Sequence, residues 1–164
     1  MYEIEIKAHC SSKLKTTIEE LTKEKGKPVS KRDVYYIREN GEVFRNRKID
    51  GINYITIKER YTDEEGIETN VENEFFIKDE ELPSYINNAK ITHYKNKDGY
   101  SWSYKGVTCE LFNVNNLGYF IELEIVSEKK IKAKETLYGL LKEFGVPLSN
   151  IEMKAYCQLI DENK

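Results

Sequence analysis

The sequence predicts a single α+β domain of about eight antiparallel strands with helices near both ends, and three observations predict it. Many segments alternate polar and apolar residues, which is the period-two pattern of strands. Asn40–Gly41 and Asp50–Gly51 are strong hairpin signals. The clearest apolar residues at helical spacing lie near the two ends of the chain, and no linker or repeat divides residues 1–164.

The first element is a strand, because residues 2–8 alternate polar and apolar side chains. A helix over residues 14–21 follows, where leucine and isoleucine recur at helical spacing. Ser11 or Ser12 is expected to cap the start of this helix, and Gly26 to mark its end.

Residues 29–76 are predicted to form a meander of strands. The two hairpin signals and a polar loop at residues 63–66 divide this stretch into four strands. A short helix over residues 82–89 is expected to begin near Pro83, since proline suits the first turn of a helix.

The second half returns to strands from about residue 91 to residue 126. Turns are predicted at Asp98–Gly99, Lys105–Gly106 and Asn115–Asn116. An amphipathic helix over residues 133–144 is expected to end at Gly145, and the capping-box pattern of residues 149–152 predicts a last helix.

Composition argues against several classes of protein. The formal net charge is −3 and the pI is about 5.6, which argues against a general nucleic-acid surface. The apolar stretches fall far short of the roughly 20 residues of a membrane-spanning helix, and no leader-like segment opens the chain. We therefore expect a soluble cytoplasmic protein with neither a membrane nor a nucleic-acid polymer as its partner.

The residue types available for chemistry are equally restrictive. Three widely spaced cysteines offer neither a disulfide framework nor a CxxC site, and two histidines argue against a His-rich metal site. The sequence contains no GxGxxG and no GxxxxGK[ST] motif. Any phosphate chemistry must therefore use side chains.

Charged residues alternate along the predicted strands. Glu3, Glu5 and Lys7 share one strand face. The pattern recurs at Arg45 and Arg47, Lys58, Glu72 and Glu74, Lys95 and Lys97, and Glu122 and Glu124. A flat sheet with one wet face would explain it. A barrel with its charged face inward would explain it as well, and that lumen would require a ligand of both charge signs, such as a divalent metal with a polyphosphate.

These strings, in this order, resemble the CYTH superfamily, also called the triphosphate tunnel metalloenzymes. The matching motifs are ExExK at Glu3–Lys7, D-x-Y at Asp33–Tyr35, R-x-R at Arg45–Arg47, T-x-K at Thr56–Lys58, LG-x-F-x-E-x-E at Leu117–Glu124 and the S-Y pair at Ala155–Tyr156. The chain departs from the family with Asn70 in place of an arginine, Lys97 where arginine is usual and Glu110 in place of an aspartate.

The resemblance covers nearly the whole chain and implies one CYTH-like domain over residues 1–164, a closed eight-stranded antiparallel β-barrel flanked by helices. It implies Mg²⁺ or Mn²⁺ as the cofactor. The implied metal ligands are Glu3, Glu5, Glu122 and Glu124, with Glu110 acting directly or through water, while Glu72 and Glu74 either bind metal or orient cations. The implied triphosphate ligands are Lys7, Arg45, Arg47, Lys58, Lys95 and Lys97, of which Lys7 and Lys58, together with Tyr35, are the expected catalytic residues.

Three functions remain open at this stage. The layout resembles class IV adenylate cyclases, which make cyclic AMP and pyrophosphate from ATP. The His-Phe pair that many of these cyclases carry before ExExK is absent ahead of Glu3, which keeps a triphosphatase acting on tripolyphosphate or thiamine triphosphate as the alternative. A non-catalytic module that binds polyphosphate or nucleotide is the third hypothesis. The expected partner is a small triphosphate, and a homodimer is left open.

Overall fold

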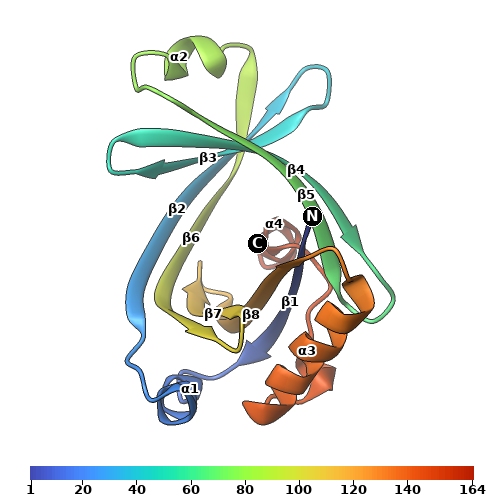
Figure 1. Ribbon diagram of the computed structural model, residues 1–164. Helices are drawn as coiled ribbons and strands as arrows, with labels where there is room; N and C mark the ends of the chain where they lie inside the picture. The colour runs from blue at the N-terminus through green and yellow to red at the C-terminus, as the bar shows by residue number, and fades with distance from the viewer.

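The computed structural model describes residues 1–164 and contains a closed barrel of eight antiparallel strands, as predicted (Figure 1). The order around the barrel is β1-β5-β4-β3-β2-β6-β7-β8, and β8 pairs with β1 to close it. The strands are β1 (Tyr2–Cys10), β2 (Lys27–Arg38), β3 (Val43–Ile49), β4 (Ile52–Thr62), β5 (Glu68–Ile77), β6 (Ala89–Tyr104), β7 (Val107–Val114) and β8 (Gly118–Ser127).

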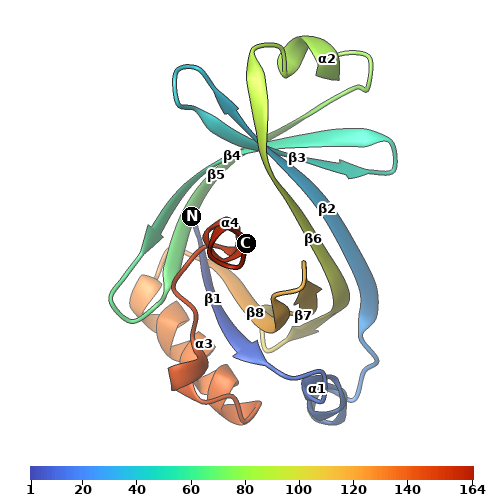
Figure 2. The ribbon, with the colours of Figure 1, turned by 180° about the vertical axis from the view of Figure 1, so that it is seen from behind.

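The helices flank this barrel. They are α1 (Leu14–Thr22), α2 (Leu82–Tyr85), α3 (Lys130–Glu143) and α4 (Tyr156–Glu162), with a short 3₁₀ turn at Leu148–Asn150. Helices α1 and α3 lie outside the lower part of the barrel, whereas α4 lies across one end of the ring of strands (Figures 1 and 2). No helix combines the length and the apolar character that crossing a membrane requires.

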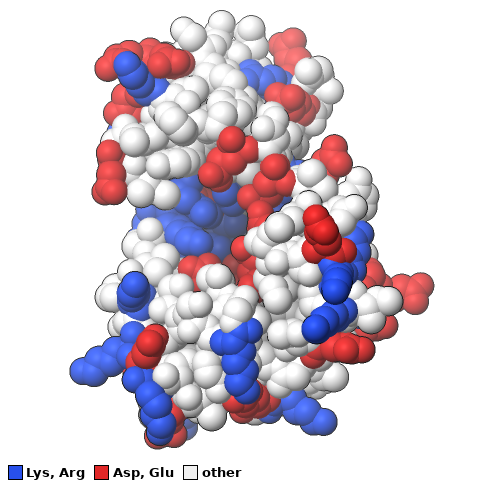
Figure 3. All heavy atoms as spheres, viewed as in Figure 1, with Lys and Arg blue, Asp and Glu red and all other residues white.

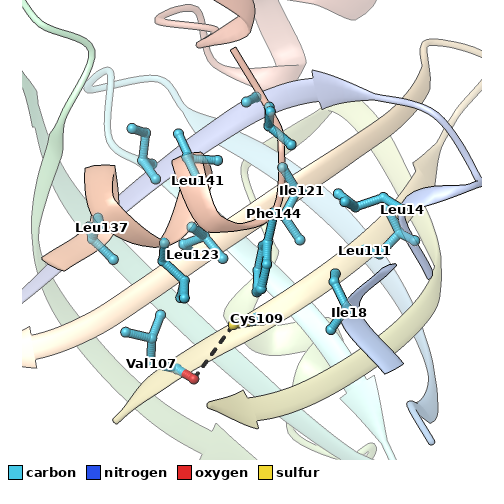
Figure 4. Close-up of a cluster of buried hydrophobic side chains, with 14 of the residues drawn as sticks. Leu14, Ile18, Val107, Cys109, Leu111, Ile121, Leu123, Leu137, Leu141 and Phe144 are labelled. Carbon is cyan, nitrogen blue, oxygen red and sulfur yellow. Dashed lines mark hydrogen bonds between the residues drawn. The ribbon is translucent and has the colours of Figure 1, made fainter. Parts of the chain in front are cut away.

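The main hydrophobic core lies outside the barrel, between the strands and the two longer helices. Leu137 and Leu141 of α3 pack in one cluster with Ile121 and Leu123 of β8, and Ile18 of α1 belongs to the same cluster (Figure 4). All five side chains are fully buried. Burying an aliphatic side chain contributes roughly 1.5–3 kcal/mol, so this cluster stabilises the barrel from its outer face.

Strand register places the alternating charges inside. Glu5 pairs with Glu124 and Lys7 pairs with Glu122 across β1 and β8, while Ile6 between them faces the outer core. A shift of one residue would exchange the two faces of a strand and bury charges in the apolar cluster. The hydrophobic pattern therefore specifies which side chains point into the lumen.

Several predicted turns are confirmed. The hairpin at Asp50 and Gly51 has positive φ angles of 50° and 79°, the conformation that Asp-Gly favours in tight hairpins. Lys105–Gly106 and Asn115–Asn116 also have positive φ and connect β6 to β7 and β7 to β8.

The predicted turn at Asp98–Gly99 is wrong, because β6 continues through both residues. Gly99 pairs with Phe112 of β7, and a Cβ atom at Gly99 would lie only 1.7 Å from the carbonyl oxygen of Leu111. This glycine permits close backbone approach between two strands and does not reverse the chain.

The capping box at residues 149–152 does not open a helix, so that prediction is also wrong. Ile151 forms an isolated bridge with Ala8, and the Glu152 amide donates to the Lys7 carbonyl at 2.9 Å. These contacts extend the chain along β1, and α4 begins only at Tyr156. Two earlier boundaries also differ. The N-cap residue of α1 is Lys13 and not a serine, although Ser11 Oγ accepts a hydrogen bond of 3.3 Å from the Lys13 amide. The helix predicted over 82–89 ends at Tyr85.

Candidate functional site

The barrel lumen encloses a cavity of about 570 Å³ that is lined mostly by charged side chains. Eight glutamates and eight lysines or arginines line it. They include every charged site residue expected from the sequence: Glu3, Glu5, Lys7, Arg45, Arg47, Lys58, Glu72, Glu74, Lys95, Lys97, Glu110, Glu122 and Glu124, together with Tyr35. Figure 3 shows the hollow, with basic atoms in its depth and acidic atoms along one side.

Three carboxylates gather on one wall, and we call Glu3, Glu5 and Glu124 the acidic trio. One oxygen of each lies within 4.8 Å of the others. Burial and the neighbouring carboxylates of Glu72 and Glu124 raise the pKa of Glu3 to about 9. Burial also raises the pKa of Glu5 to about 8, despite the opposing charge of Lys58. Repulsion among these groups would be relieved by a cation, and carboxylate oxygens are ligands that suit Mg²⁺ or Mn²⁺.

Glu122 and Glu110 make different contacts from those of the trio. Glu122 lies 3.1 Å from the Lys97 ammonium and accepts a hydrogen bond of 2.7 Å from the Tyr156 hydroxyl. Burial would raise the pKa of Glu122, but Lys97 and this hydrogen bond lower it to about 2. Glu110 pairs with Lys31 at 3.2 Å. Both carboxylates thus neutralise lysines within the lumen and lie outside the acidic trio.

The opposite wall is basic and is held in shape by one buried aspartate. Arg47 donates two hydrogen bonds to Asp33, Nε to Oδ1 at 2.6 Å and Nη2 to Oδ2 at 2.7 Å. The Lys95 ammonium lies 3.5 Å from the same carboxylate and donates to the Tyr35 hydroxyl at 2.8 Å. Burial would raise the pKa of Asp33, but Arg47 and Lys95 outweigh it and hold that pKa below its ordinary value.

Arg45 and Lys58 project between the two walls. Arg45 donates to the Thr56 hydroxyl at 3.1 Å, while its buried Nε has no hydrogen-bond partner. Lys58 lies 3.5 Å from Glu72 and 3.9 Å from Glu5, both looser than an ideal charge-assisted hydrogen bond. These two cations therefore keep donor capacity for an anionic ligand.

The lumen also contains residues that the motif comparison missed. Glu68 lies 3.2 Å from Lys7 and also binds Arg60, and Lys31 lines the same cavity, where it pairs with Glu110. Each one continues an alternation already present in its strand: Arg60 follows Lys58 by two positions, and Lys31 precedes Asp33 by two. Extending the period-two rule along each strand would have found them.

Asn70 stands where the resemblance implies an arginine, and the neighbouring strand β4 provides an arginine at the paired position. Asn70 is buried, neither polar atom of its side chain has a partner, and its register partner on β4 is Arg60. The guanidinium in this part of the lumen therefore comes from β4.

The two ends of the lumen differ. Lys7 and His9 lie toward the C-terminal segment, because the Glu152 amide donates to the Lys7 carbonyl and the Glu152 carboxylate lies 3.0 Å from His9 Nε2. Glu3 and Glu5 lie farther along β1, at a strand rise of about 3.3 Å per residue. On β8, Glu122 contacts Tyr156 of α4, and Glu124 is one inward position farther away. The acidic trio is therefore on the side away from α4.

Trp102 and Cys109 have side chains that could bind a base or a metal, but their roles are structural. Trp102 is only 3% exposed and donates its indole N–H to the Glu24 carbonyl, so it packs and does not offer a stacking surface. Cys109 is buried in the outer core, and all three cysteines are free.

No known family profile and no curated protein matches the sequence. Solved structures do match. The PH1012 protein from Pyrococcus horikoshii is 27% identical with a TM-score of 0.82, covering 96% of this chain and 98% of that one. A candidate adenylate cyclase from Vibrio parahaemolyticus is 14% identical (TM-score 0.75, 98% of both chains). The candidate adenylyl cyclase HpAC1 from Hippeastrum, described as having a dominant triphosphatase activity, is 17% identical (TM-score 0.69, 99% and 96%). This chain therefore shares the fold of these solved structures, a closed eight-stranded barrel of the kind that the resemblance to the triphosphate tunnel metalloenzymes implies.

Proposed function

We propose that this protein is a divalent-metal-dependent enzyme acting on triphosphates, and that its reaction is that of a class IV adenylate cyclase, converting ATP to cyclic AMP and pyrophosphate. The observation that carries the proposal is the order of charges along the lumen. The acidic trio lies on the side away from α4, and Lys7, Lys95 and Lys97 lie beside α4.

A triphosphate that enters with its tail first would place its β- and γ-phosphates among the lysines. Its α-phosphorus would then lie beside Glu3, Glu5 and Glu124. Attack of the ribose 3′-hydroxyl on the α-phosphorus breaks the bond to the β-phosphate oxygen, and the lysines stabilise the departing pyrophosphate. This arrangement matches cyclisation better than attack on the γ-phosphorus.

Individual residues have distinct proposed roles. Glu3, Glu5 and Glu124 would hold a Mg²⁺ or Mn²⁺ ion, which would neutralise phosphate charge when bound. Lys58, which faces both Glu5 and Glu72, would keep the triphosphate in line for displacement. Arg45, Arg47, Lys95 and Lys97 would bind phosphate oxygens, and Tyr35 orients Lys95 through its hydroxyl.

One observation favours hydrolysis as the alternative. The lumen lining contains few apolar side chains, among them Val43, Phe44 and Ala155, and no pair of stacked aromatic rings that could hold an adenine. A triphosphatase needs to recognise only the tail, which this lumen is well equipped to do. The dominant triphosphatase activity described for the similarly folded HpAC1 supports the same alternative.

Product analysis separates the hypotheses. Purified protein is incubated with ATP, tripolyphosphate or thiamine triphosphate, each with Mg²⁺ or Mn²⁺. The proposal predicts equal amounts of cyclic AMP and pyrophosphate from ATP, with tripolyphosphate acting as a competitive inhibitor. Orthophosphate without cyclic AMP would overturn the cyclase in favour of the triphosphatase, and binding without any product would leave the non-catalytic module.

Metal dependence is tested in the same assay. Because the proposed metal ligands are hard carboxylate oxygens, we expect activity to disappear in excess chelator and to return when Mg²⁺ or Mn²⁺ is added. Full turnover after exhaustive metal removal would contradict the proposed role of the acidic trio.

A further inference from the structure

Asn70 lies on the lumen side of β5, and we propose that it sets the affinity of the acidic trio for a divalent cation. It does so as a neutral oxygen ligand of the ion, at a position where a guanidinium would repel that ion. The inference rests on the proposed function, because it assumes that Glu3, Glu5 and Glu124 hold Mg²⁺ or Mn²⁺. It goes beyond that function in giving an uncharged side chain of β5 a part in binding the ion.

The strand register places Asn70 beside the acidic trio. Glu68 and Glu72, two residues before and after it on β5, both line the cavity, so alternation directs Asn70 to the same face. Its register partner on β1 is Glu3. Directly opposed residues of an antiparallel pair have Cα atoms about 4.5–5.5 Å apart, so the carboxamide of Asn70 and the carboxylate of Glu3 are neighbours on one face.

The side chain of Asn70 has no hydrogen-bond partner within the protein. It is only 1% exposed, and both its amide nitrogen and its carbonyl oxygen are unpartnered. No other buried side chain has two polar atoms in this state. An unsatisfied buried polar group is costly, so this carboxamide indicates a partner supplied by what the lumen binds. Beside three carboxylates that partner is a cation, and carbonyl oxygens are ligands that suit Mg²⁺ and Mn²⁺.

The arginine on the neighbouring strand is held away from the trio. Arg60, the register partner of Asn70 on β4, binds the Glu68 carboxylate and donates to the Met153 carbonyl at 2.8 Å. Glu68 neutralises this guanidinium and also lies 3.2 Å from the Lys7 ammonium. The charge of Arg60 is therefore committed to groups beside the C-terminal segment.

An arginine at position 70 would have the opposite effect. The acidic trio makes one ion pair within 4 Å, between Lys58 and Glu5. A guanidinium opposite Glu3 would be a second cation at this wall, and it would compete with a divalent ion for the same carboxylate oxygens. Placing the arginine one strand away, at position 60, leaves those oxygens to the ion.

Titration of the substrate-free protein with Mn²⁺, followed by calorimetry and by the electron paramagnetic resonance of unbound Mn²⁺, measures the affinity independently of turnover. Asn70→Leu keeps the approximate side-chain volume but removes the oxygen, and should weaken binding about 10–100-fold. Asn70→Arg also adds a positive charge and should weaken binding at least ~100-fold. Asn70→Asp retains an oxygen ligand and should bind Mn²⁺ at least as tightly as the unaltered protein.

Two further variants separate the position of the charge from its amount. Asn73→Arg adds the same charge on the exposed outer face of β5, and should change the Mn²⁺ affinity by less than about twofold. The double variant Arg60→Asn with Asn70→Arg keeps the total charge of the lumen but moves the guanidinium to β5. It should bind Mn²⁺ as weakly as Asn70→Arg alone, and full affinity of this variant would overturn the role of position 70.

Circular dichroism confirms that each variant is folded, and Glu124→Gln shows the loss of affinity expected when a carboxylate ligand is removed. If Asn70→Leu and Asn70→Arg both bound Mn²⁺ as tightly as the unaltered protein while Glu124→Gln did not, Asn70 would have no part in the ion site and the proposed function would stand. If the unaltered protein bound neither Mn²⁺ nor Mg²⁺, the proposed function itself would fail.

Discussion

The outer and inner faces of the barrel are built from the same strands but are stabilised in opposite ways. On β8, Ile121 and Leu123 face an apolar cluster, whereas Glu122 and Glu124 face the lumen. The outer face gains free energy from burial, while the inner face retains carboxylates, and there burial together with repulsion from Glu72 and Glu124 raises the pKa of Glu3. Successive side chains of one strand therefore have different roles: one packs in the apolar cluster that stabilises the fold, and the next faces the lumen where the chemistry is proposed.

The two walls of the lumen show a second contrast. Asp33 and Glu122 neutralise the basic wall from within, so its arginine and lysines are held in defined positions. The acidic trio makes one ion pair within 4 Å, between Lys58 and Glu5 at 3.9 Å. A bound cation is therefore expected to change the acidic wall more than the basic one.

The largest effect on turnover should come from a substitution on the inner face that leaves the protein folded. Glu124→Gln is expected to reduce turnover by about 100–1000-fold, because one ligand of the ion that would neutralise phosphate charge is weakened. Its melting temperature should not fall, since the substitution removes like-charge repulsion. The control is Glu128→Gln, an exposed position just past β8, which should turn over normally. A normal rate for Glu124→Gln would remove Glu124 from the proposed site.

The next effect tests whether the basic wall depends on its internal carboxylate. Asp33→Asn should lower the free energy of unfolding by roughly 3–5 kcal/mol at pH 7, because Arg47 and Lys95 would remain buried without their counter-charge. Urea unfolding of both proteins measures the difference.

The pH dependence of that difference has a definite sign. The pKa of Asp33 is lowered in the folded protein, so its contribution to stability is present above the ordinary aspartate pKa and is lost as pH falls toward the folded-state value. The gap between the two proteins should be full at pH 7 and shrink below about pH 4. A gap that stays constant down to pH 2.5 would contradict the ion-pair explanation.

A substitution on the outer face should instead lower stability and leave turnover unchanged. Leu137→Ala removes a fully buried side chain from the cluster between α3 and the strands, and should cost about 2–5 kcal/mol of unfolding free energy. At a temperature where the variant is still folded, its turnover should equal that of the unaltered protein. A large loss of activity in the folded variant would show that the two faces are coupled.

The inner-face charges could be predicted from sequence because they depend only on alternation and on short motifs within single strands. The position of α4 across one end of the barrel could not. It depends on contacts such as His9 with Glu152 and His93 with Asp161, whose partners are 143 and 68 residues apart. The pattern at residues 149–152 has the local features of a helix start, but pairing with β1 prevails because the backbone of Glu152 finds a partner in Lys7.

Gly99 is a second position where the local sequence pattern predicts the wrong structure, and its substitution should give the smallest of the effects predicted here. Glycine after aspartate usually indicates a turn, yet here it allows β6 and β7 to approach. Gly99→Ala would place a Cβ atom 1.7 Å from the Leu111 carbonyl oxygen, so the two strands must separate locally. We expect a loss of about 1–3 kcal/mol in unfolding free energy, measured by urea titration. Gly106→Ala is the matched control for a true turn: it meets no atom within 4 Å, so its cost comes only from the positive φ of 77°. If Gly99→Ala were as stable as the unaltered protein, the close approach of β6 and β7 would not be the reason for a glycine at this position.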